Sequence, residues 1–305
     1  LWNWAVAPQV ALKLANMPLL WTILQELHQD DVSLAIRTKA TATLGTILSH
    51  SKYENAPDSL SAQTWIVPRL LQLLTTQQQQ EDLHFVDWKR RALRTLRCLV
   101  SAEWGRKLTH GSGGEIYTLF LAILKDATES VESRTHVALV FASLVKDPPP
   151  VWEKESVGPT LEASLVQLLS DPTTPHELFP PCCTALTACL QHQPSNVFPA
   201  TLFLTMGNVL QDHLDAGAYH AAFSSLQQEL VQQFSNELET FLCKPVLDLW
   251  TLFLTPVGPS FDASRLTCLH LVETAAVSHK KVLVDHQELL ASLVNVCLFT
   301  SGQTK

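Results

Sequence analysis

Residues 17–27, MPLLWTILQEL, and residues 32–48, VSLAIRTKATATLGTIL, are the stretch of sequence that decides the fold. Apolar residues recur in both segments at spacings of three and four, which is typical of one stripe along an α-helix. These apolar positions are Leu20, Ile23, Leu24 and Leu27 in the first segment and Ile36, Ala40, Leu44, Ile47 and Leu48 in the second. Asp31, in the acidic link between the segments, is the expected N-cap of the second helix. The two segments therefore predict an antiparallel helix pair.

This unit recurs along the chain. Short leucine-rich helices are expected at residues 65–74, 116–124, 161–169, 202–210 and 246–254, most of them followed by a polar break and a longer helix. Equivalent leucines at positions 24, 71, 121, 168, 210 and 252 are separated by 47, 50, 47, 42 and 42 residues. Helix pairs repeating at about 40–47 residues are typical of stacked helical arrays. Alternating strand patterns are essentially absent, so the predicted class is all-α.

The alternation of a short helix ending in LLQLL (residues 70–74) or LVQLLSD (165–171) with a longer helix such as RRALRTLRCLV (90–100) resembles the HEAT/armadillo superfamily. The resemblance covers nearly the whole chain, although the Asp and Arg or Lys ladder of regular HEAT repeats is missing. It implies a right-handed α-solenoid of stacked antiparallel helix pairs, with about six pairs forming a single array over residues 1–305. The chain begins at Leu1 in mid-pattern, so we expect it to be a fragment of a longer protein.

The resemblance also implies a function. Degenerate arrays of this kind occur in large scaffolds of centrioles, cilia and chromosomes, so we expect a non-catalytic scaffold that binds other proteins and packs against neighbouring repeats of its own chain. Two alternatives stay open. One is a chromosome- or DNA-associated adaptor that uses a basic stripe, and the other is a helical regulatory segment of an enzyme whose catalytic domain lies outside this chain.

Charge and cysteine content narrow the class of protein. Residues 1–150 hold 15 basic and 14 acidic side chains, a net charge of +1, whereas residues 151–305 hold 6 and 15, a net charge of −9. An acidic second half argues against a general nucleic-acid binder. The seven cysteines are odd in number and form no CxxC pair, which favours an intracellular, reducing compartment, cytoplasmic (including centrosome or cilium) or nuclear. No apolar run approaches the ~18–20 residues of a membrane span.

Motifs for chemistry are missing from the sequence. No HExxH or CxxC spacing accompanies the 12 histidines, so we expect no metal ion. Cys182 and Cys189 are expected to share a helix face as buried apolar side chains. The glycine-rich loop at residues 111–114 is followed by Glu115 and Ile116 rather than Lys-Ser/Thr, so it is no phosphate loop. With no GxSxG element either, we expect no enzyme activity and no cofactor.

One surface feature carries a binding hypothesis. Arg90, Arg94 and Arg97 fall within a narrow arc of the helix expected around residues 88–101, opposite Ala92, Leu93, Leu96 and Leu99. The second helix of a pair often lines the concave face of a solenoid, so this basic stripe is a candidate site for an acidic or phosphorylated segment of a partner protein. The competing interpretation is a solvated face on which Asp87 pairs with Arg90 or Arg91.

Overall fold

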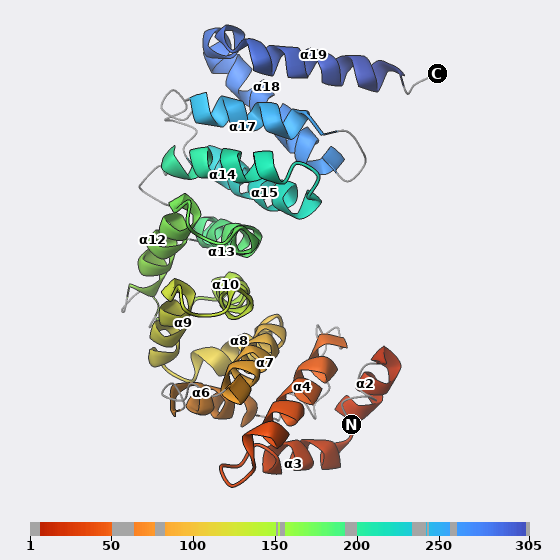
Figure 1. Cartoon of the computed structure of the whole chain (residues 1–305), viewed down its shortest axis with the longest axis vertical. Coiled ribbons are helices and arrows are strands. Elements are labelled where there is room, and N and C mark those ends of the chain that lie inside the picture. Colours follow the sequence, from red (N-terminus) through yellow and green to blue (C-terminus); the bar gives the residue numbers. More distant parts are fainter. Residues whose placement is uncertain are drawn as a thin grey trace. The chain divides into compact units, whose positions relative to one another are not determined.

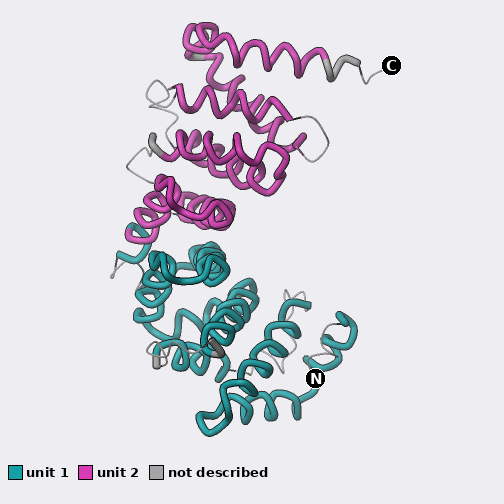
Figure 2. The backbone as a smooth tube through the Cα atoms, in the orientation of Figure 1, with its two compact units in different colours: residues 1–159 teal, residues 160–305 magenta. Residues whose placement is uncertain are grey.

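The computed structural model describes residues 7–50, 64–76, 83–150, 152, 156–192, 200–233, 242, 244–256 and 261–302. Within these ranges every regular element is a helix and no strand occurs, so the all-α prediction is confirmed (Figure 1). The chain divides into two compact units, residues 1–159 and residues 160–305 (Figure 2). The single array over residues 1–305 stays a prediction.

In unit 1, the longer helices pack against one another along the chain. Helix α4 packs against α7, and α7 packs in turn against α10. Helix α2 packs against α3 and α4, α6 against α7 and α8, and α9 against α10. The bounds are α2 (Pro8–Ala15), α3 (Pro18–Glu26), α4 (Leu34–His50), α6 (Ile66–Thr76), α7 (Leu83–Val100), α8 (Glu103–His110), α9 (Glu115–Lys125) and α10 (Val131–Leu144).

Unit 2 shows two rows of helices. Helix α13 packs against α15 and α15 against α18, while α14 packs against α17 and α17 against α19. The bounds are α12 (Val157–Ser170), which begins at the end of unit 1, the 3-10 turn η2 (His176–Leu178), α13 (Phe179–His192), α14 (Ala200–Asp212), α15 (Gly217–Gln233), α17 (Lys244–Leu254), α18 (Asp262–Asp285) and α19 (Gln287–Gly302). Helix α18 is kinked at His279, whose backbone is not helical.

The short helices expected from the leucine pattern are all present, as α6, α9, α12, α14 and α17. Three details were wrong. The helix expected after Asp31 begins at Leu34, and the Ser33 carbonyl accepts the first backbone hydrogen bonds, so Ser33 and not Asp31 precedes the helix. Ile23 is 39% exposed and Ile36 is 48% exposed, whereas Trp21, which the expected stripe did not include, is buried.

Buried tryptophans hold neighbouring elements together. The indole Nε1 of Trp21 donates to the Ala15 carbonyl at 3.0 Å and thereby joins α3 to the end of α2. In unit 2, Nε1 of Trp250 on α17 donates to the side-chain oxygen of Gln227 on α15 at 2.7 Å. A large apolar ring whose single donor has a partner can be fully buried without leaving an unpaired polar group.

Helices α4 and α7 approach each other closely at one glycine. A Cβ atom added to Gly45 would lie 2.6 Å from the Oγ1 atom of Thr95. The Thr95 hydroxyl donates to the Arg91 carbonyl at 2.8 Å and lies 3.3 Å from the Thr41 carbonyl. The Thr95 hydroxyl therefore occupies the space that a Cβ atom at Gly45 would need, so a side chain at position 45 would force this hydroxyl to move.

Gly105 and Gly207 offer a matched test of backbone crowding. A Cβ atom on Gly105 would lie 2.5 Å from the carbonyl carbon of Leu99, whereas one on Gly207 meets no atom within 4 Å. We expect Gly105→Ala to lower the free energy of unfolding by about 1–3 kcal/mol, since backbone must move. Gly207→Ala should raise it by up to about 1 kcal/mol through higher helix propensity. Urea titrations followed by circular dichroism measure both, and equal effects would contradict the close approach.

Candidate partner-binding surface

The two faces of α7 differ as the sequence predicted. Ala92, Leu93, Leu96 and Leu99 are fully buried. The opposite face carries four arginines, of which Arg94 and Arg97 are exposed and Arg90 and Arg91 are half-buried. The amphipathic pattern therefore accounts for the solvent-facing positions of Arg90, Arg94 and Arg97, whereas Arg91 was not part of the predicted stripe.

Arg90 and Arg91 are held by carboxylates. Arg90 donates from Nη2 to Oδ1 of Asp87 at 2.6 Å and from Nη1 to Oε2 of Glu132, on α10, at 2.8 Å. Arg91 donates from Nε to Oδ2 of Asp87 at 3.0 Å. Burial raises the pKa of Asp87, but the hydrogen bonds from Arg91 and Arg90 outweigh it and the pKa lies below its usual value. The solvated, paired face expected as the competing interpretation is therefore present at these two arginines.

Arg94 and Arg97 differ from every other arginine of the chain. Within the described residues, neither makes an ion pair or a side-chain hydrogen bond. Each of the other arginines has a partner. The partners are Asp30 for Arg37 and Arg69, Asp87 for Arg90 and Arg91, Asp147 for Arg106, the Leu124 carbonyl for Arg134, and Asp262 for Arg265.

The imidazole of His136 on α10 lies within the field of these two guanidinium groups. Its side chain is buried, and within the described residues its ring nitrogens have no hydrogen bond. The pKa of His136 is lowered to about 4, first by burial and then by the positive charge of Arg97 and Arg94, against the opposing charge of Glu132. Glu132 Oε1 lies 3.7 Å from His136 Nε2, while its other oxygen accepts from Arg90. The carboxylate nearest to His136, that of Glu132, is therefore already paired with Arg90.

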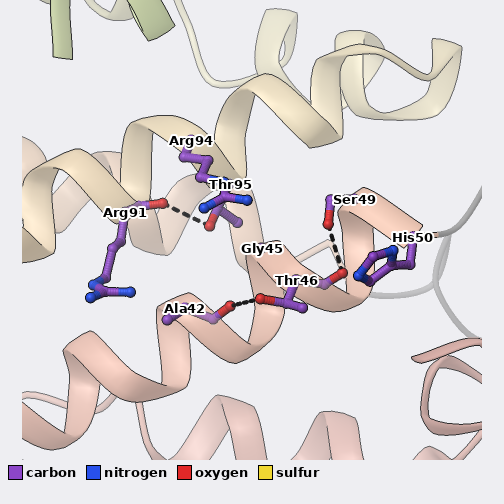
Figure 3. Close-up of a pocket in the computed structure, with 8 residues that line it drawn as sticks. All are labelled: Ala42, Gly45, Thr46, Ser49, His50, Arg91, Arg94 and Thr95. Carbon is purple, nitrogen blue, oxygen red and sulfur yellow. Dashed lines mark hydrogen bonds between the residues drawn. The ribbon is translucent and has the colours of Figure 1, made fainter. Parts of the chain in front are cut away.

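A pocket of about 260 Å³ adjoins Arg94 between α4 and α7 (Figure 3). Three hydroxyl groups in it already donate to backbone carbonyls, namely Thr46 to Ala42, Ser49 to Thr46 and Thr95 to Arg91. The guanidinium groups and the His50 ring are therefore the side-chain donors that the pocket can offer to a ligand. Its lining residues are Ala42, Gly45, Thr46, Ser49 and His50 from α4 and Arg91, Arg94 and Thr95 from α7.

The predicted stripe and the observed site overlap in part. The structure leaves Arg94 and Arg97 exposed, but it engages Arg90 with two carboxylates and adds Arg91 to the pocket. Sequence reasoning missed the contribution of α4, because spacing within one helix says nothing about the register of its neighbour. The polar run of Thr46, Ser49 and His50 near the end of α4 was the only available signal.

The cysteines of α13 are buried thiols. Cys182, Cys183 and Cys189 lie buried in α13. Burial raises the pKa of the Cys183 thiol well above its usual value and that of Cys189 to about 12, so the reactive thiolate is disfavoured. The described part of the chain contains no group of three or more His, Cys, Asp or Glu side chains that could hold a metal ion. The absence of metal, cofactor and catalysis stays a prediction.

Comparison with known proteins adds no assignment. No protein-family model matches the chain, and no curated protein matches it significantly. Among the described residues, no helix has both the length and the apolar character needed to cross a membrane.

The field acting on His136 can be measured directly. Replacing both Arg94 and Arg97 with Gln should raise the pKa of His136 above its value of about 4, because two positive charges that oppose protonation are removed. A pH titration of the histidine ring protons by NMR reports this change. The matched control is Lys280→Gln with Lys281→Gln on α18, which removes the same charge from unit 2. An unchanged pKa in the α7 variant would contradict the placement of the guanidinium groups.

The same histidine makes stability depend on pH. The pKa of His136 is about 4 in the folded chain and about 6.5 without the fold, so protons bind the unfolded chain more readily. Its contribution to stability is complete above about pH 6.5 and is lost as the pH falls towards 4. We expect His136→Gln to flatten the fall of the unfolding free energy across this window. Urea titrations at several pH values between 4 and 7 give the two slopes, and parallel slopes would contradict the prediction.

Proposed function

We propose that this chain is a non-catalytic scaffold that binds an acidic segment of a partner protein through α7 and its neighbours. The observation that carries the proposal is the pair Arg94 and Arg97, two exposed arginines one turn apart that lack a partner within the described residues. A guanidinium group that makes no ion pair within its own chain is available to bind a carboxylate or phosphate group of another molecule. It can do so through two parallel hydrogen bonds.

The arrangement of unit 1 supports a protein partner. Helices α4, α7 and α10 lie side by side, so the exposed arginines of α7 are flanked by a helix on each side. In the right-handed HEAT/armadillo-like solenoid that we propose for the chain, such second helices line the surface on which extended partners bind. The assignment to this superfamily and to a centriolar, ciliary or chromosome-associated scaffold rests on the sequence pattern.

The state of the thiols supports an intracellular location for the scaffold. Cys98, Cys183, Cys189 and Cys268 are free thiols, and all but Cys98 are buried. Chains that fold in oxidising compartments commonly use cysteines as disulfides, whereas those in the cytoplasm or nucleus keep them reduced. We therefore propose the cytoplasm, including the centrosome or cilium, or the nucleus.

Charge reversal tests the surface. Arg94→Glu combined with Arg97→Glu should remove the partners that proximity labelling or affinity capture finds for the wild-type chain, because the attraction becomes repulsion. Both side chains are exposed, so the free energy of unfolding should change by no more than about 0.5 kcal/mol. Quantitative mass spectrometry of the captured proteins and a thermal melt provide the two measurements.

Lys280→Glu with Lys281→Glu is the matched control, since it changes the net charge equally on exposed positions of α18. Proteins lost from the α7 variant and kept by the α18 variant are the partners of this surface. A set of captured proteins that is the same for the wild type and both variants would show that Arg94 and Arg97 form a solvated face only.

A further inference from the structure

The surface around α7 carries a local surplus of positive charge. Four arginines of α7, at positions 90, 91, 94 and 97, face two carboxylates, Asp87 and Glu132, so four positive charges less two negative ones leave a net charge of +2. His136 is uncharged at neutral pH because its pKa is lowered to about 4. The surplus is therefore located on Arg94 and Arg97, the two guanidinium groups that the carboxylates do not reach.

The pocket beside Arg94 is small. Its volume of about 260 Å³ lies just below the range of about 300–1,000 Å³ that is usual for pockets binding whole small molecules. Its small volume suits a single charged side chain.

We infer that this pocket and the adjacent Arg94 and Arg97 bind a phosphate monoester carried on a side chain of the partner protein. A phosphorylated side chain carries a charge of about −1.5 to −2 at pH 7, which matches the surplus of +2, and offers three acceptor oxygens. A carboxylate carries a single negative charge and would leave one guanidinium group unneutralised. The inference rests on the proposed function and names the chemistry of its partner.

The positions of the donors are consistent with this ligand. Arg94 lines the pocket, and Arg97 follows three residues later, at a spacing that places the two side chains about 5–6 Å apart at Cβ. Arg91 uses Nε for Asp87, and within the described residues its terminal nitrogens have no hydrogen bond. Ser49 is exposed on the α4 wall of the same pocket, which makes it a position for testing where the phosphate lies.

Fluorescent peptide libraries with degenerate flanks test the inference on the purified chain. One library has phosphoserine at its fixed central position, and two others have glutamate or serine there. By fluorescence anisotropy, we expect the phosphoserine library to bind at least tenfold more tightly than the glutamate library, with the serine library weakest. The affinity should fall with rising salt, since exposed charges are screened. Equal affinities for phosphoserine and glutamate would overturn the inference.

Variants locate the bound phosphate. Arg94→Gln with Arg97→Gln should weaken phosphoserine binding at least tenfold, whereas Lys280→Gln with Lys281→Gln should leave it unchanged. Ser49→Glu should weaken binding by placing a negative charge in the pocket, whereas Ser49→Gln, of similar size, should not. If Ser49→Glu binds as well as Ser49→Gln, the phosphate does not occupy this pocket. Thermal melts of each variant confirm that the chain is folded.

Competitors separate the sources of phosphate. Inorganic phosphate that competes as strongly as the phosphoserine library would show a site for the free ion, and tighter Arg94-dependent binding of single-stranded DNA would show a nucleic-acid site; either result overturns the inference. Phosphatase treatment of the lysate should release the partners captured through Arg94 and Arg97. Partners that are lost on charge reversal but persist after phosphatase would refute the phosphate while leaving the proposed function standing.

Discussion

The close approach of α4 to α7 at Gly45 and Thr95 is the contact on which the candidate surface depends. A Cβ atom at Gly45 would come within 2.6 Å of Thr95 Oγ1, so a side chain at position 45 would displace the Thr95 hydroxyl from the pocket wall. The same contact aligns the last turns of α4 with the middle of α7. As a result Thr46, Ser49 and His50 face Arg91 and Arg94 across one pocket (Figure 3). A different register between these helices would leave the same side chains on separate surfaces.

Electrostatics then decides which arginines are available. Asp87 accepts from both Arg90 and Arg91, at i+3 and i+4 along the same helix. Glu132, supplied by α10, accepts from Arg90 as well. Exposed pairs of this kind each contribute little to stability, about 0–1 kcal/mol. These ion pairs matter more for binding, because they occupy the nearby carboxylates and leave the charges of Arg94 and Arg97 unneutralised.

In unit 2, two histidines make hydrogen bonds within the fold, unlike Arg94 and Arg97 on α7. His286 Nδ1 accepts from the Leu289 N–H at 3.2 Å, and its Nε2 donates to Asp248 at 2.9 Å, so one ring connects the start of α19 to α17. His220 donates from Nε2 to the Leu214 carbonyl at 3.0 Å and lies against Phe253 and Phe261. The contacts of these two histidines are with backbone groups, aromatic rings and one carboxylate of unit 2.

The sequence by itself determined the helical class, the places of the short leucine-rich helices and the division of α7 into an apolar and a basic face. These features follow from periodicity, which acts within one segment and needs no knowledge of its neighbours. It did not determine helix α8 or the exposure of Ile23. It also did not determine that Arg91, rather than Arg90 of the predicted stripe, lines the pocket with Arg94. Only the tertiary structure decided these, because a core position or an ion pair depends on which residues of another helix arrive opposite, and that register is set by contacts such as Gly45 with Thr95.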